Sequence, residues 1–364
     1  MGRARIRDLG ISIGTMKPGS LNAITDIPGV WVGHSTVIHD EPTIARTGVT
    51  VILPREGRVS LEHMLGGFSA LNGVGEMTGL LWLEETGLIS APIALTNTHQ
   101  VGRVHEALVE HFAPFGGWPF DLPIVSETWD GYLNDIHSFP LERSHVLDAI
   151  TSAATGPVAE GNVGGGTGTI CHEFKGGIGT ASRVVVYQDE EYVVGALVQA
   201  NHGAREDLMV AGAPVGRHIG ADRYPPPWAQ PVQAGSIVVI LGTNAPLSSV
   251  QCKRLARRGI IGFARAGGVG HHGSGDLFLA FSTAHHIPAQ PETLVEIRML
   301  PHHHLNPFFQ AAAESVEEAI LNSMAAAESM TGYRGRVAHA IPLDEVVESG
   351  GRYRGYLKSP AGDP

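Results

Sequence analysis

The chain has 364 residues, and its 43% of hydrophobic residues is enough to form a large core. Its 25 lysines and arginines against 36 aspartates and glutamates leave a net charge of −11, and no basic stripe compensates for it, which argues against nucleic-acid binding. Glycine is the unusual residue: there are 47, nearly double the usual share of about 7%, without the period of a collagen-like chain. These features predict a globular protein.

Nothing in the sequence predicts a membrane or secretory segment. Residues 1–19 carry charges but no continuous apolar core, so we expect no signal peptide. The uncharged stretch 224–252 contains only a short apolar run, 237–241, whereas a membrane span needs about 20 apolar residues. Two cysteines, Cys171 and Cys252, cannot build a disulfide framework in so long a chain. We therefore expect a soluble, cytoplasmic α/β protein.

Short apolar runs with Gly, Pro, Asn or Asp close by predict strands. In chain order these runs are 30–38, 49–53, 92–96, 122–125, 184–188, 192–198, 237–241 and 277–282. Helical patterns lie between and after them, at 100–115, 141–153, 246–266 and 307–329. For the third helix, Asn244 is the expected N-cap, and Pro246 lies near the first helical position.

The longest helical pattern, 307–329, predicts one buried stripe. Its apolar residues recur at helical spacing, at Phe309, Ala313, Val316, Ile320 and Met324. No linker or internal repeat interrupts the chain, so we expect one large mixed α/β domain over 1–364. The proline-rich segment 220–234 predicts an exposed loop directly before a strand.

Three glycine clusters, at 161–168, 176–179 and 267–275, raise the possibility of a phosphate-binding loop. None has the Gly-Lys-Ser/Thr ending of a P-loop, and the first does not fit GxGxxG between a strand and a helix. We therefore interpret the clusters as tight turns and sites of close backbone packing, and we expect no cofactor.

Nineteen histidines suggest a metal site, but their spacing is unfavourable. They include the adjacent histidines of 271–272, 285–286 and 302–304, which point to different sides of a strand or helix. His172 is followed by a glutamate but lacks the second histidine of an HExxH pair. We expect surface or loop histidines and no metal, and keep a metal-dependent hydrolase as an alternative.

Three Gly-Ser steps, at 19–20, 235–236 and 273–274, point to a different chemistry. A serine hydroxyl can attack the carbonyl of a preceding glycine, and hydrolysis then frees a serine whose α-amine serves as its own general base. Ser236 opens a strongly apolar strand after the proline-rich loop. Ser274 and Asp276 would point the same way in an extended chain, although a turn before a strand would use the same residue types.

The chain resembles the DmpA/BapA family, the L-aminopeptidase/D-esterase and β-peptidyl aminopeptidase group, along nearly its whole length. The resemblance rests on motifs at 26–34, 46–54, 71–79, 92–102, 127–135, 164–169, 175–183, 197–206, 234–240 and 273–283. It implies a four-layer α/β/β/α sandwich that cuts itself between Gly235 and Ser236. The products would be a 1–235 α subunit and a 236–364 β subunit, assembled as a homotetramer.

The same resemblance implies a role for each matched residue. Ser236 would be the N-terminal nucleophile, with Ser274 and Asp276 orienting its amine and hydroxyl. Asn201 would donate to the oxyanion, and Tyr132 would line the site and help stabilise the tetrahedral intermediate. The sequence departs from the family at two places: some members carry Glu in place of Asp276, and His202 stands where a tyrosine is expected.

These residues predict an aminopeptidase or amidase that acts through an acyl-enzyme on Ser236. Its partner would be a short peptide, amide or ester with a free amine, and we expect no nucleic-acid or membrane partner. Glu127 or Asp130 would bind the ammonium group, although both also suit turn capping in their motif. A non-maturing binding protein of the same fold is a further alternative, whereas a related acetyltransferase would use a threonine nucleophile. The sequence leaves α- or β-aminoacyl preference and stereochemistry open.

Overall fold

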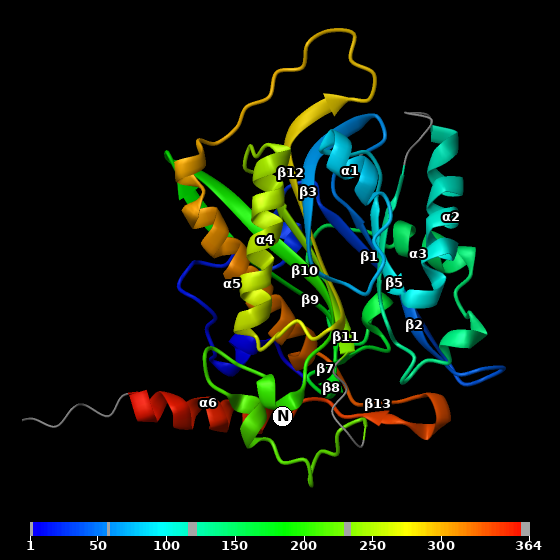
Figure 1. Ribbon diagram of the computed structural model, residues 1–364, viewed down its shortest axis with the longest axis vertical. Helices are drawn as coiled ribbons and strands as arrows, with labels where there is room; N and C mark the ends of the chain where they lie inside the picture. Colours follow the sequence, from blue (N-terminus) through cyan, green and yellow to red (C-terminus); the bar gives the residue numbers. More distant parts are fainter. Residues whose placement is uncertain (1–2, 57–58, 116–121, 229–233, 358–364) are drawn as a thin grey trace, which may run out of the picture.

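The computed structural model describes residues 3–56, 59–115, 122–228 and 234–357. Two β-sheets pack face to face, and a pair of helices covers the outer face of each sheet (Figure 1). The fold is therefore the four-layer α/β/β/α sandwich expected from the sequence. None of the described helices combines the length and apolar character that crossing a membrane requires.

The two sheets differ in size and connectivity. The first has the order β1-β2-β5-β6, with β5 and β6 parallel, and consists of Trp31–His39, Ala45–Leu53, Ile93–Asn97 and Ile124–Thr128. The second has the order β4-β3-β12-β11-β10-β9, with β11 and β12 parallel. In that order its strands are Leu88–Ile89, Glu62–Gly73, Gly273–Pro288, Ala234–Thr243, Glu190–Asn201 and Gly177–Tyr187.

Helices complete the outer layers. On the four-stranded sheet lie α2 (Val101–Phe112) and α3 (Arg143–Thr151), and on the six-stranded sheet lie α4 (Ser249–Arg265) and α5 (Asn306–Ala325). The remaining elements are short or peripheral: α1 (Leu80–Thr86), α6 (Leu343–Leu357), the hairpin of β7 (Ile170–Cys171) with β8 (Phe174–Lys175), and that of β13 (Met330–Thr331) with β14 (Val337–Ala338).

The apolar run of β11 explains its central place in the molecule. Val238 and Ile240 point into the core between the sheets, while Ile237, Val239 and Leu241 point into the core beneath α4 and α5. A strand that is apolar on both faces must be covered on both sides, and β10 and β12 also satisfy its two edges. The first residues of β11 are thus held rigidly in the middle of the six-stranded sheet.

Each predicted strand overlaps an observed one, and the four predicted helices are α2 to α5. The long strand β3 was not predicted from the sequence. The predicted N-cap of α4 is wrong: Ser248 caps the helix by accepting from the Gln251 amide, whereas Asn244 accepts from the Val193 amide at 2.8 Å. The loop at 220–228 is largely exposed as expected, and 229–233 lie outside the described residues.

Helix α5 corrects a second expectation, because it is buried all round and not along one stripe. Its carboxylates meet arginines from other elements. Arg183 of β9 contacts Glu318 at 2.6 Å and Glu314 at 3.1 Å, and Arg7 contacts Glu318 at 2.7 Å. Buried carboxylates need such partners, so this ion-pair network allows the polar face of α5 to be enclosed.

The glycine clusters serve packing, as the sequence predicted. Residues 164–166 form a buried helical turn against β2, and residues 177–179 open the buried strand β9. The cluster at 267–275 connects α4 to β12.

Candidate active site

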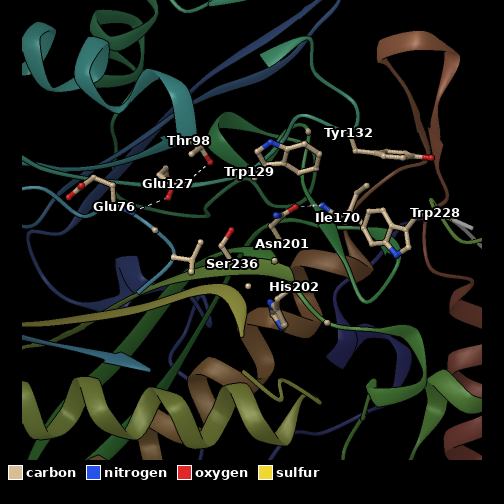
Figure 2. A pocket seen from close by; sticks show the side chains of 16 residues that line it. Glu76, Thr98, Glu127, Trp129, Tyr132, Ile170, Asn201, His202, Trp228 and Ser236 are labelled. Carbon is tan, nitrogen blue, oxygen red and sulfur yellow. Dashed lines mark hydrogen bonds between the residues drawn. The ribbon is translucent and has the colours of Figure 1, made fainter. Parts of the chain in front are cut away.

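Ser236 lies near the start of β11, between β10 and β12. The strand register places Asn201 opposite it on one side and Gly275 on the other. The Ser236 side chain is buried, and its Oγ has no hydrogen-bond partner among the described residues. It forms part of the wall of a cavity of about 580 Å³ (Figure 2). A buried hydroxyl without a partner at a cavity wall is free to contact a bound molecule.

Ser274 and Asp276 lie on the neighbouring strand β12, on either side of Gly275. The Ser274 hydroxyl donates to Asp276 Oδ1 at 2.7 Å, which confirms that the two side chains point the same way. Asn72 of β3 donates to Asp276 Oδ2 at 2.9 Å. Burial raises the pKa of Asp276, although the hydrogen bonds from Ser274 and Asn72 oppose the shift. The result is a buried, oriented carboxyl–hydroxyl pair on the strand next to Ser236, and neither residue is among those that line the cavity.

Asn72 was not identified from the sequence as a site residue. It falls within the 71–79 motif, but its role depends on the pairing of β3 with β12, in which Asn72 stands opposite Asp276. No local pattern carries that information.

Asn201, at the end of β10, lines the same cavity. Its Oδ1 accepts the Ile170 amide hydrogen at 2.8 Å (Figure 2). Because the backbone amide is a donor, it fixes which end of the side-chain amide is the oxygen. The Nδ2 group is then left free to donate to a molecule in the cavity beside Ser236.

Glu127 of β6 is the buried carboxylate of the cavity wall, which Glu76 also lines with an exposed side chain. It accepts hydrogen bonds from the Thr98 hydroxyl and from the Glu76 amide, the latter at 3.0 Å (Figure 2). Burial raises its pKa, and the two hydrogen bonds partly offset the shift. None of the described lysines or arginines forms an ion pair with it. It is therefore a buried acid whose counter-charge could come from a ligand.

Asp130 occupies a different position from Glu127. It is fully buried and is not among the residues that line the cavity. Its Oδ1 accepts from Asn134 at 3.1 Å, and its Oδ2 has no partner among the described residues. Burial raises its pKa to about 7. Of the two acids expected to bind an ammonium group, the structure brings Glu127 to the cavity and keeps Asp130 behind the wall.

Aromatic side chains form much of the remaining wall. Tyr132 packs edge to face against Trp228 with 5.7 Å between ring centroids, and Trp129 is the third aromatic residue lining the cavity. The Tyr132 hydroxyl donates to the Pro227 carbonyl and points away from Ser236 (Figure 2). Tyr132 thus lines the cavity as expected, while its hydroxyl is engaged by the segment that leads towards Ser236 along the chain.

The sequence also missed a cluster at the base of the cavity wall. Cys171, His172 and His202 are buried, and one ligand atom from each lies within 4.8 Å of the others. Among the described residues, these three form the one group of His, Cys, Asp or Glu side chains close enough together to hold a metal ion. His172 lacks a histidine partner at helical spacing, but the residue that follows β10, His202, supplies one in space. His202, the unusual residue of its motif, forms part of the cavity wall.

The adjacent histidines match the expected surface or loop positions only in part, because His285 is buried in β12, whereas His286 and His302 are exposed. His285 hydrogen-bonds the Arg298 carbonyl at 2.7 Å, the exposed His286 contacts Glu62 at 2.6 Å, and His302 contacts Arg254 at 2.9 Å. In the part of the chain that the structure describes, none of these pairs belongs to a group with metal-ligand spacing.

Comparison with known proteins agrees with this geometry. Residues 22–338 match the model of Peptidase family S58. The β-peptidyl aminopeptidase BapA of Sphingosinicella microcystinivorans is 43% identical over 369 residues, which cover 96% of this chain and 92% of that protein.

Two solved structures have nearly the same fold. A Burkholderia sp. β-aminopeptidase has a TM-score of 0.90 and 45% identity, covering 99% of this chain and 100% of its own. The second structure is the L-aminopeptidase D-Ala-esterase/amidase of Ochrobactrum anthropi, with a TM-score of 0.90 and 43% identity, covering 96% of this chain and 99% of its own. That enzyme is described as a prototype for the serine aminopeptidases and as a new variant of the Ntn hydrolase fold. The chain therefore belongs to peptidase family S58 and is a serine aminopeptidase with the N-terminal nucleophile hydrolase fold.

Proposed function

We propose that this aminopeptidase matures by cutting itself between Gly235 and Ser236. The observation that carries the proposal is the unpartnered Oγ of Ser236 at the cavity wall. Its attack on the Gly235 carbonyl carbon forms an ester as the peptide C–N bond breaks, and the hydroxyl proton passes to the new α-amine. Water then hydrolyses the ester and leaves residues 1–235 and 236–364 as two subunits.

The surroundings of Gly235 support this site of cleavage. A Cβ atom at Gly235 would lie 2.8 Å from the Asn201 carbonyl oxygen and 2.9 Å from the Cα of His202. Glycine therefore lets β11 begin against the end of β10, with the Gly235 carbonyl next to the serine that attacks it.

The freed amine then serves as the base for hydrolysis. An α-amine has a pKa of about 7.7–8.0, so near neutral pH it can accept the Ser236 hydroxyl proton as Oγ attacks the substrate carbonyl. The Nδ2 group of Asn201 donates to the oxyanion. The proton passes to the leaving amine, and water releases the acyl group from Ser236. Ser274 and Asp276, on the adjacent strand, orient the amine and hydroxyl.

The substrate is a short peptide, amide or ester with a free N-terminal amine. Glu127 would bind the ammonium group, because it is the buried carboxylate of the cavity and no described cation forms an ion pair with it. Asp130 is not among the residues that line the cavity, so it would not contact the ammonium group. Trp129, Tyr132 and Trp228 would pack against the side chains of the substrate.

Intact-mass spectrometry and denaturing gels test maturation directly. We expect purified protein to separate into chains of 1–235 and 236–364, and Ser236→Ala to remain full length and inactive. Ser20→Ala is the matched control, because Ser20 also follows a glycine but donates its hydroxyl to Asp26 at 3.0 Å. This control should still be cut. Active wild-type protein that consists only of full-length chain would rule out the proposal.

A substrate panel addresses specificity. Aminoacyl p-nitroanilides with α- and β-amino groups, in L and D forms, would be compared with the same compounds acetylated on nitrogen. We expect turnover only of substrates with a free amine, with β-aminoacyl compounds included because a relative bears that activity in its name. Equal turnover of acetylated and free substrates would contradict an ammonium site at Glu127.

We also propose assembly into a homotetramer. The segment 289–299 after β12 forms a long loop at the edge of the molecule (Figure 1). It is exposed, and it carries apolar side chains. Leu294 is 97% exposed, and Ile297 and Met299 are about half exposed. An exposed apolar segment of this kind is typical of a contact between subunits. Light scattering on the eluting protein should give four cut protomers, and Leu294→Glu should weaken the assembly. A monomeric wild type would contradict it.

A further inference from the structure

The cluster of Cys171, His172 and His202 is built by a tight hairpin. The turn between β7 and β8 places His172 and Glu173 at φ angles of 49° and 62°, the left-handed geometry of a two-residue hairpin turn. The His172 amide donates to the His202 carbonyl at 2.6 Å, which ties the hairpin to the end of β10. Gly203 completes the fit, because a Cβ atom there would lie 2.4 Å from the His172 ring.

The ligand atoms of this cluster lie close together. The Cys171 sulfur lies 3.9 Å from both ring nitrogens of His202. The Nδ1 atom of His172 lies 2.8 Å from the Ala204 carbonyl, so it must carry the proton, and Nε2 has the lone pair. This Nε2 atom is buried and has no partner among the described residues. An unpartnered buried nitrogen beside a thiol and a second imidazole indicates a missing ligand.

We propose that Cys171 Sγ, His172 Nε2 and a ring nitrogen of His202 form a binding site for Zn²⁺. Thiolate and imidazole are the ligands that zinc prefers, and the carbonyl bonded to Nδ1 of His172 is the kind of partner that orients a ligating histidine. Zinc bonds of about 2.0–2.3 Å in a tetrahedral site hold ligand atoms about 3.3–3.6 Å apart, so the cluster must contract by about 1 Å. The fourth position would go to water, and the cavity beside His202 provides an entry path.

Two of the three groups are already in the protonation state that binds zinc, whereas the Cys171 thiol must lose its proton. Burial lowers the pKa of His172 to about 4 and that of His202 further, so both rings are neutral at pH 7. Burial raises the pKa of the Cys171 thiol to about 12. Zinc binding therefore releases one proton from the thiol to solvent as the Zn–S bond forms.

Zinc bound at this site should alter the positions of the residues proposed to act in catalysis. Cys171 follows Ile170 and His202 follows Asn201, so the cluster flanks both ends of the hydrogen bond between the Ile170 amide and Asn201 Oδ1. A contraction of the cluster would displace Asn201 relative to Ser236. We therefore expect bound zinc to inhibit hydrolysis. This consequence rests on the proposed function, whereas zinc binding itself does not.

Metal binding is measured on the full purified protein, stripped with a chelator and dialysed against Zn²⁺. We expect one zinc per chain by elemental analysis, and with Co²⁺ as a probe we expect a thiolate-to-cobalt absorption band. Cys171→Ser and His172→Gln should each weaken zinc binding at least about tenfold and remove or shift the band. The matched control is Cys252→Ser, since Cys252 is also buried and free, but it contacts the Leu65 carbonyl in place of a histidine.

Two outcomes would overturn the zinc site: wild-type protein that takes up no zinc, or zinc binding of equal affinity in Cys171→Ser, His172→Gln and wild type. The second would assign the metal to exposed histidines. Thermal unfolding of the metal-free variants checks that they are folded. Turnover is titrated separately, and inhibition should follow occupancy in wild type but not in Cys171→Ser. Full occupancy without inhibition would overturn the link to Asn201 while leaving the metal measurement intact.

Discussion

Buried carboxylates in two regions of the molecule have different kinds of partner. Beside α5, Glu314 and Glu318 meet the guanidinium group of Arg183, and Arg7 adds a second cation to Glu318. At the cavity, Glu127 meets a hydroxyl and a backbone amide, and it has no ion pair with a described lysine or arginine. Glu314 and Glu318 thus have cationic partners within the chain, whereas Glu127 has no cationic partner among the described residues.

The pKa shifts of Glu314 and Glu127 run in opposite directions, although Glu317, also on α5, has a pKa raised by burial to about 7. Burial alone would raise the pKa of Glu314, but hydrogen bonds from Gln310, from two backbone amides and from Arg183 together lower it. Burial raises the pKa of Glu127, and its hydrogen bonds do not reverse the shift. An uncompensated buried carboxylate costs stability. Such a group is expected where a ligand supplies the missing charge, which is the role that we propose for Glu127.

The largest expected effect comes from removing the nucleophile. Ser236→Ala should lower turnover by about 10⁴-fold or more, because no acyl-enzyme can form without the hydroxyl. The rate is measured with an aminoacyl p-nitroanilide. Circular dichroism should show an unchanged fold, since the lost hydroxyl has no hydrogen bond among the described residues. Retention of more than one hundredth of the activity would assign the nucleophile to another residue.

Removing the ion pairs beside α5 should lower the stability of the protein and leave the rate of hydrolysis unchanged. Arg183→Met should reduce the free energy of unfolding by about 3–5 kcal/mol, because it leaves Glu314 and Glu318 buried without their shared cation. Arg103→Met is the control: its contact with Glu106 is exposed, and the loss should stay below about 1 kcal/mol. Urea unfolding measures both. Equal, small losses in the two variants would show that the network does not support α5.

Asn201→Ala tests the proposed oxyanion donor. Loss of one such donor should lower kcat by about 10²–10³-fold. The control Asn162→Ala removes an asparagine whose side chain only bonds the backbone of Glu328, at 2.9 Å and 3.1 Å, and it should retain wild-type kcat. Steady-state kinetics on cut protein are required, so that slow maturation is not mistaken for slow turnover. A change in KM alone would mean that Asn201 binds substrate without stabilising the oxyanion.

Glu127→Gln should weaken recognition of the substrate amine. A charge-assisted hydrogen bond is worth about 1.5–3 kcal/mol, so kcat/KM should fall about 10- to 100-fold. Asp130→Asn discriminates between the two candidate acids, because Asp130 does not line the cavity and its loss should have a smaller effect. The reverse ranking of the two variants would move the ammonium site to Asp130.

The smallest effects appear in the pH dependence of stability. The pKa of Glu127 is raised, so the folded state holds the Glu127 proton more readily than the unfolded state does. At a pH above this raised pKa, the ionised carboxylate destabilises the fold, and Glu127→Gln should therefore stabilise the protein. This gain in stability should disappear as the pH falls towards 4.5. Glu314 has a lowered pKa and contributes stability above pH 4.5 that is lost as the pH falls through its folded pKa. Glu314→Gln should therefore destabilise at pH 7 and less at pH 3. Unfolding curves with the same sign for both variants would contradict the comparison.

Apart from the family and its fold, the features that the sequence predicted are local ones. Val238 and Ile240 alternate with Ile237, Val239 and Leu241, so the buried strand could be recognised from its own residues. Ser274 and Asp276 share a face because any extended chain places i and i+2 residues on one side, and their hydrogen bond confirms it. The ordered motifs predicted the family and the four-layer fold. The cut at Gly235 and the roles of the site residues stay predictions.

What only the tertiary structure decided depends on contacts between distant segments. The register of β3 against β12 brings Asn72 to Asp276, and the approach of the β7–β8 hairpin to β10 brings Cys171 and His172 to His202. The sequence pattern of α5 predicted one buried stripe, but arginines from elsewhere in the chain allowed the whole helix to be enclosed. The spacing of hydrophobic residues and the alternation of side chains involve residues close together in the chain, so both can be recognised from the sequence. The pairing of buried charges and ligands is set by how strands register and layers close, and it emerges only when the chain has folded.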